Sequence, residues 1–393
     1  MPWRLSMYAR TLHTLAHQPN ISILGLLFCL AMQLVVSPLA TYIAVFVWTC
    51  FVLLLLTMVD LPSEETPKPT LTEDRKQRAR HHIIHAYGRV FLLRHPTSAP
   101  VSFTRVYVQG PFHNLEPASL AQIFSFHTAL EAMLLHHLRL AIVVGVDPTH
   151  VTSVALLLGS HMIIAHGMSP DEVSRRLRSL SPMFEAFVRS HTALSIEDCW
   201  RAIHRANALG WTHFDHTPPA ADAIDIHEYL HYDDTPNGAM HLIDPARILL
   251  FRPPSNLPYG VPWRDVAGRR HFGPEHYTPL FGDFGVRLVI CCGAPASCCD
   301  TRAWRAAGIV VEILHLPGVL PSIDRFLTLL KVVPGCIAVQ CGSADAVVRL
   351  AVAAHLIRHR GFSAPAAIAW THIVHPVMPD PVCKEVVLMV GGK

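Results

Sequence analysis

The later part of the chain alternates between short apolar runs and longer stretches with apolar residues at helical spacing. The apolar run from Cys336 to Val339 predicts a buried strand. Apolar positions on one helix face between Ala346 and Ala354 predict a helix. Small and polar residues lie between the two. The pattern therefore predicts a strand, a tight loop and a helix N-terminus, an arrangement whose backbone N–H groups can converge on a phosphate.

A similar alternation begins at about residue 101. In the first half it predicts strands at residues 102–109 and 140–146 and helices over 119–140 and up to about 166. In the second half it predicts strands at residues 248–251, 286–291, 309–314 and 337–339. Ser169, Pro170 and Glu172 have the order of a capped helix start. Strands alternating with helices predict an α/β fold made of two similar units.

Before this region, the 39 residues from Ile21 to Val59 include no charged side chain. One membrane-spanning helix needs about 20 apolar residues, and Pro38 divides the tract, so we expect a transmembrane hairpin, with one long tilted helix as the alternative. The tract is too long for the apolar part of a cleaved signal peptide. Basic residues on both sides predict that both flanks, and hence the globular part, face the cytosol. Nothing in the sequence specifies which membrane.

Charge and cysteine spacing exclude some function classes. The formal net charge is only +3 over 393 residues, which gives no electrostatic footprint for nucleic acid. No spacing of His, Cys and carboxylates predicts a metal site or a cofactor. The pairs Cys291-Cys292 and Cys298-Cys299 are interpreted as packing thiols, with zinc binding or a redox disulfide as the alternative.

One segment carries a specific family resemblance. The run Asp225–Asp233, continuing through Asn237-Gly238 to Asp244–Phe251, resembles the interdomain segment of the cell-division-cycle-fourteen family of dual-specificity phosphatases. More diffuse similarity extends over about residues 100–380 and includes Gly110-Pro111, Pro170–Val173, Tyr277–Phe281, Gly335–Cys341 and Ile368–Trp370. The resemblance implies an α/β fold with tandem dual-specificity (cysteine) phosphatase folds and a substrate groove between them, here preceded by the N-terminal transmembrane hairpin.

The resemblance and the apolar tract together give an expected domain order. The expected segments are a short N-terminal segment (1–20), the transmembrane segment (21–59), a basic linker (60–97), a non-catalytic phosphatase-like domain (98–222), a connector helix (223–238) and a phosphatase-like domain with a degraded phosphate loop (239–393).

The catalytic motif that the resemblance implies is incomplete. Cys341 stands at the nucleophile position, but Val347 replaces the phosphate-binding arginine and Pro317 replaces the general-acid aspartate. The substrate-binding loop would consist of Gly342, Ser343, Ala344, Asp345 and Ala346. Two family glycines are alanines in this loop, and Asp345 adds a charge that would repel phosphate. His375-Pro376 replaces the arginine-proline pair that positions the hydrolytic water.

These losses predict a pseudophosphatase that is anchored in a membrane and binds a protein partner, with a phosphoprotein as one candidate. Each lost clamp or acid costs roughly 10²–10⁴-fold in rate. The alternative is an active or residually active tyrosine/serine phosphatase that uses Cys341 as its nucleophile. A third hypothesis is a membrane protein whose globular part serves assembly. Cys341 itself is open between a small packing residue and a vestigial or redox-active nucleophile.

Overall fold

The computed structural model describes residues 83–94, 103–108, 116–137, 139–189, 192–214, 223–292, 300–314, 319–341 and 346–376. The chain divides into two compact units, 1–70 and 71–393, and the described residues all belong to the second. The expected transmembrane hairpin at 21–59 lies outside them. Among the described helices, α6 (Pro148–His166) is long and apolar enough to cross a membrane, but 72% of its apolar window is buried inside the protein.

The first half is built on a four-stranded sheet with the strand order β1-β2-β4-β3. The strands are β1 (Ile83–Tyr87), β2 (Val90–Leu93), β3 (Thr104–Tyr107) and β4 (Leu140–Val143). Strands β2 and β3 run parallel to β4, whereas β1 pairs antiparallel with β2. The remaining elements of this half are α5 (Leu120–His136), α6, α7 (Pro170–Arg176), the short 3-10 turn η2 (Ser181–Met183), β5 (Phe187–Arg189), β6 (Thr192–Leu194) and α8 (Ile196–Ala208).

Strands β1 and β2 correct one expected boundary. The basic linker expected at 60–97 is wrong from Ile83 onward, because residues 83–93 form a hairpin of the first sheet. Ala86, Val90 and Leu92 are fully buried there. The histidines and arginines around this hairpin obscured its short apolar runs in the sequence.

Helix starts follow the local signals that the sequence contains. Helix α7 begins as predicted, because Ser169 Oγ accepts a hydrogen bond from the Glu172 N–H and Pro170 occupies the first helical position. Helix α5 begins with a full capping box between Ser119 and Gln122. These caps satisfy donors that the first turn of a helix leaves without partners.

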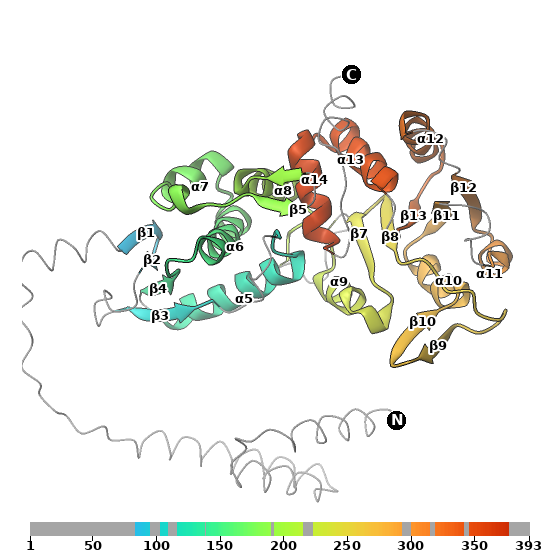
Figure 1. Cartoon of the computed structure of the whole chain (residues 1–393), viewed down its shortest axis with the longest axis horizontal. Helices are drawn as coiled ribbons and strands as arrows, with labels where there is room; N and C mark the ends of the chain where they lie inside the picture. Colours follow the sequence, from blue (N-terminus) through green and yellow to red (C-terminus); the bar gives the residue numbers. More distant parts are fainter. Residues whose placement is uncertain are drawn as a thin grey trace, which may run out of the picture. The chain divides into compact units, whose positions relative to one another are not determined.

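The second half is built on a five-stranded sheet with the order β12-β11-β13-β8-β7 (Figure 1). The strands are β7 (Met240–Asp244), β8 (Ile248–Phe251), β11 (Val286–Cys292), β12 (Val310–Leu314) and β13 (Cys336–Gln340). All neighbours are parallel except β7, which pairs antiparallel with β8. The other elements are α9 (Ile226–Asp233), η3 (Thr235–Asn237), the hairpin β9 (Trp263–Val266) and β10 (Arg269–Phe272), α10 (Pro274–Asp283), α11 (Arg302–Ala306), α12 (Val319–Val332), α13 (Ala346–Arg360) and α14 (Ala364–Val374).

Side chains of the central strand β13 point alternately to the two faces of this sheet, and both faces are buried. Ile337 and Val339 belong to the main core, together with residues of α12, α13 and α14. Cys336 and Ala338 belong to a second core with residues of α10 and α11. A parallel strand covered on both faces has to be apolar throughout, and this is why its sequence is a continuous apolar run. The predicted α/β architecture is confirmed at this level.

Helix α14 joins the two halves into one core. Its Trp370 ring lies 5.7 Å from the ring of Trp211, which follows α8. Trp211 also stacks on Phe362 at 5.8 Å. The main core therefore contains residues from both sheets.

Candidate functional site

The strand–loop–helix pattern lies where the sequence predicts it. Strand β13 ends at Gln340, and helix α13 begins at Ala346. The strand lies between β11 and β8, so its carboxyl end opens at the middle of the sheet, the usual position of ligand sites in α/β folds. The Cys341 N–H donates to the Phe251 carbonyl oxygen at 2.9 Å, which holds the first loop residue to the end of β8.

Cys341 lies in the core rather than in an open cleft. Only 8% of the residue is exposed, and it belongs to the same core cluster as Val339 and Val348. A nucleophilic thiolate needs both access and a stabilising environment. The surroundings of Cys341 fit a small packing residue.

Most of the predicted phosphate loop and the predicted acid position lie outside the described residues. These positions are Gly342, Ser343, Ala344 and Asp345 of the loop and Pro317 at the acid position. Ala346 and Val347 lie in the first turn of α13, without a description of their side chains. The roles of these residues remain predictions. Cys292 to Cys299 also fall outside the described side chains, whereas Cys291 is buried at the end of β11.

A buried chain of hydrogen-bonded side chains links the end of α14 with β7 and α9. His375 is only 6% exposed, and its Nδ1 lies 2.5 Å from Nδ1 of His241 on β7. The other ring nitrogen of His241, Nε2, lies 2.8 Å from Asp233 Oδ1 at the end of α9. With the proton of His241 on Nε2, this N–H donates a hydrogen bond to Asp233, and His241 Nδ1 accepts one from the Nδ1–H of His375. This chain fixes the tautomers of both rings.

Burial, with help from neighbouring basic groups, keeps His375 neutral. Its pKa lies well below the ordinary histidine range because the ring is buried, and His241, Arg349 and His372 lower it further. Arg349 is itself only 2% exposed and lies on α13, two residues after Val347. Its guanidinium therefore faces the interior near His375.

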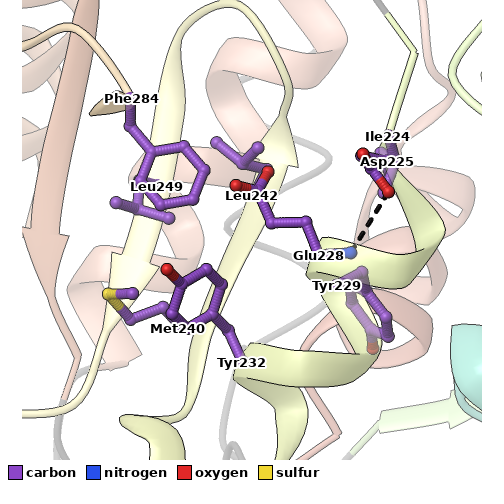
Figure 2. Close-up of a pocket in the computed structure, with 9 residues that line it drawn as sticks. All are labelled: Ile224, Asp225, Glu228, Tyr229, Tyr232, Met240, Leu242, Leu249 and Phe284. Carbon is purple, nitrogen blue, oxygen red and sulfur yellow. Dashed lines mark hydrogen bonds between the residues drawn. The ribbon is translucent and has the colours of Figure 1, made fainter. Parts of the chain in front are cut away.

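A hollow opens between α9 and the strands β7 and β8 (Figure 2). Its empty space, including the open mouth, is about 250 Å³. The lining residues are Ile224, Asp225, Glu228, Tyr229, Tyr232, Met240, Leu242, Leu249 and Phe284. Figure 2 shows the Glu228 carboxylate extending over Leu242 toward Leu249 and Phe284. The hollow thus combines apolar walls with an acidic group.

The two acidic side chains that line the hollow, Asp225 and Glu228, differ in their hydrogen-bond partners. Asp225 is the N-cap of α9 and accepts hydrogen bonds from the N–H groups of His227 and Glu228. Glu228 has no basic partner within the part of the chain that the structure describes. Burial raises the pKa of Glu228, and the nearby carboxylates of Asp225 and Asp283 raise it further. The ionised form of Glu228 is therefore disfavoured, and a bound cation would stabilise it.

Sequence reasoning identified the connector but missed these side-chain groups. The resemblance singled out the segment that contains α9, because its residue pattern is specific. It did not indicate that Glu228 faces a hollow or that Asp233 binds His241. Only the antiparallel pairing of β7 with β8 and the turn after α9 bring these side chains together.

Known proteins provide an independent comparison. No protein-family model matches the chain. It is 25% identical over 273 residues to dual specificity protein phosphatase CDC14B of Mus musculus, a match that covers 66% of this chain and 53% of that protein. It is also 25% identical over 277 residues to dual specificity protein phosphatase CDC14AB of Danio rerio, covering 66% of this chain and 43% of that protein. The chain spans about half the length of these curated relatives.

Among solved structures, the crystal structure of PTPMT1 is similar over 39% of this chain and 94% of that one, with 19% identity and a TM-score of 0.30. The curated relatives confirm the resemblance to the cell-division-cycle-fourteen phosphatases that the sequence predicts. The chain is thus a dual-specificity-phosphatase-like protein with a mixed α/β fold. The transmembrane hairpin, the tandem arrangement of phosphatase folds and the degraded site remain predictions.

Proposed function

We propose that this phosphatase-like protein is a membrane-anchored pseudophosphatase that binds a protein partner through the hollow beside α9. The partner inserts a lysine side chain into the hollow, and a phosphoprotein is one candidate for the partner. The observation that carries the proposal is the Glu228 carboxylate, which lies in an apolar hollow without a basic partner among the described residues.

The shape and chemistry of the hollow favour lysine over other side chains. Leu242, Leu249 and Phe284 provide apolar contact for an aliphatic stem. Lysine carries a compact ammonium on an unbranched apolar stem, which matches a single carboxylate among apolar walls. Asp225 and Asp283 add negative potential around Glu228. An ammonium paired with Glu228 would relieve the repulsion among these carboxylates.

The sequence at the phosphate loop supports the loss of catalysis. Val347 cannot bind phosphate oxygens as arginine does, and Pro317 cannot protonate a leaving group. The burial of Cys341 at the end of β13 agrees with a packing role. The charge-free tract from Ile21 to Val59 supports attachment to a membrane, with the described domain on its cytosolic side.

Binding to the hollow can be tested with the full-length chain and a pool of nonapeptides that carry lysine or norleucine at the central position. We expect lysine peptides to bind more tightly, and Glu228→Gln to weaken them by roughly 5- to 20-fold, the effect of removing one charge-assisted contact. Affinity should rise with pH as Glu228 ionises. Asp171→Asn, which removes an exposed carboxylate on α7, is the matched control. Equal binding of the lysine and norleucine pools would refute the lysine assignment.

Catalysis is tested separately by hydrolysis of an aryl phosphate. We expect no turnover above that of Cys341→Ser, because the clamp and the acid are absent. Restoring the arginine with Val347→Arg tests whether the clamp alone is limiting. Wild-type turnover that disappears in Cys341→Ser would favour the alternative, an active phosphatase with Cys341 as its nucleophile.

A further inference from the structure

The hairpin β9–β10 forms a separate two-stranded sheet before α10 (Figure 1). Its strands pair from Trp263↔Phe272 to Val266↔Arg269 and are joined by a turn of two residues. Both turn residues have positive φ, 50° at Ala267 and 75° at Gly268, which identifies a tight turn of the primed hairpin type. Phe272 is buried in the second core, so the base of the hairpin is fixed to the domain.

One face of the hairpin carries cations around an apolar residue. Alternation and register place Arg264, Val266 and Arg269 on the same face. All three are exposed, and Val266 is 49% exposed. Within the described residues neither of these two arginines has a carboxylate partner. Their charges are therefore available to an external anion.

Exposed aromatic rings belong to the same segment, with Trp263 on the opposite face of the hairpin and Tyr259 before β9. Tyr259 is 57% exposed and Trp263 is 47% exposed. The guanidinium of Arg270 lies 4.3 Å from the Trp263 ring centre, and that of Arg302 lies 4.6 Å from the Tyr259 ring centre. These stacked arginines also pair with acidic residues, Asp265 and Asp300 respectively. The rings are thus held in place at the surface while the charges of Arg264 and Arg269 stay uncompensated.

The charge of this segment is concentrated. Residues 252–272 include four arginines and one aspartate, a net charge of +3, which equals that of the whole chain of 393 residues. Arginine beside tryptophan, tyrosine and an exposed aliphatic residue is the composition of protein surfaces that lie at a membrane–water interface. The strands are short and rich in arginine, which disfavours strand addition by a protein partner.

We propose that the β9–β10 hairpin lies on an anionic lipid surface, with Arg264 and Arg269 at the headgroups and Val266 at the interface. The occupant is a membrane because of the charge complementarity and because the same chain contains the charge-free tract 21–59; in this respect the inference rests on the proposed anchor. The hairpin would orient the domain on the membrane that the anchor selects.

The test uses the full-length chain mixed with phosphatidylcholine vesicles, with or without 30% phosphatidylserine. The variant Val266→p-benzoylphenylalanine is irradiated, and lipid adducts are detected by mass spectrometry. We expect adducts on anionic vesicles, several-fold fewer on neutral vesicles, and fewer at high salt. Each of Arg264→Ala and Arg269→Ala should lower the yield by about fivefold.

Exposed positions elsewhere provide matched controls. Val310 and Val332 are 61% and 64% exposed, and the same probe at either position should give few adducts. The pair Arg175→Ala and Arg178→Ala, exposed arginines on and after α7, should leave the yield at position 266 unchanged. Equal yields at positions 266, 310 and 332, or no yield at 266, would overturn the proposal, as would adducts to protein instead of lipid in a membrane extract.

Vesicle flotation distinguishes the contact made by the hairpin from attachment through the proposed anchor. A chain that floats without adducts at position 266 keeps the anchor and overturns the hairpin contact. A chain that gives anionic-lipid adducts at 266 but does not float stably supports the hairpin contact and refutes the anchor.

Discussion

Each half of the structure contains a polar chain of one carboxylate and two buried histidines, and the two polar chains differ in how closely the carboxylate approaches. The chains are Glu131–His161–His127 in the first half and Asp233–His241–His375 in the second. The distance from the carboxylate to the middle histidine is 3.4 Å in the first chain and 2.8 Å in the second. Only the second distance is typical of a strong charge-assisted hydrogen bond.

The two chains also differ in which histidine has a strongly lowered pKa. In the first chain it is the middle residue, because burial lowers the pKa of His161 to about 3, with His127 and His166 adding to the shift. In the second chain it is the end residue, His375, whose pKa is lowered mainly by burial. Burial thus keeps an imidazole neutral in both chains, at the middle position in the first and at the end position in the second.

Removing the carboxylates should give the largest difference between the chains. Asp233→Ala should destabilise the fold by about 2–3 kcal/mol, because it leaves the buried His241 Nε2–H without its acceptor. Glu131→Ala should cost less than about 1 kcal/mol, since the Glu131 side chain is 47% exposed and makes only a long contact. Urea denaturation of both variants measures this difference. Equal losses would show that the shorter distance has no energetic consequence.

The pH dependence of stability tests the first chain. The folded-state pKa of His161, about 3, lies below its ordinary value of 6.5, so between these pH values the folded protein binds fewer protons than the unfolded one. Stability should therefore fall as the pH drops through this window, with a contribution of up to about 2 kcal/mol between pH 7 and pH 5. His161→Leu should flatten this acid limb in thermal melts recorded at several pH values. An unchanged limb in His161→Leu, matching that of the exposed control His136→Gln, would contradict the prediction.

Substitutions of His375, at the end of the second chain, should have the smallest effect on stability. His375→Leu removes the donor to His241 Nδ1, whereas His375→Gln can supply an amide N–H. We expect the glutamine variant to be more stable by about 1 kcal/mol, the net value of one buried hydrogen bond. Chemical denaturation at pH 7 compares them. If the leucine variant is as stable as the glutamine variant, packing and not the hydrogen bond holds this position.

Local sequence signals predicted the central strands and the helix starts correctly. Strand β8 has the predicted bounds Ile248–Phe251, and α13 begins at the predicted Ala346. Both are determined by apolar runs and their ends, which are local properties. The strand at Val90–Leu93 was missed because its apolar run is short and basic residues surround it.

The histidine chains could not be predicted for a different physical reason. His241 and His375 are 134 residues apart, and His127 and His161 are 34 apart, so only the tertiary fold brings them together. The sequence has 27 histidines, which leaves no single pair distinguishable from the others. Glu228 was missed similarly, because helical spacing alone does not show that the strands β7 and β8 leave a hollow opposite it.

Helix α6 has a consequence for experiments on membrane topology. A hydropathy plot counts Pro148–His166 as a possible span, although most of it packs inside the first half. Reporter enzymes fused after residue 137 and after residue 214 should therefore report the same side of the membrane. During synthesis the insertion machinery meets this segment before its packing partner α8 has been made. Truncations that end between α6 and α8 would consequently give a false span, and reporter fusions placed beyond α6 should retain α8.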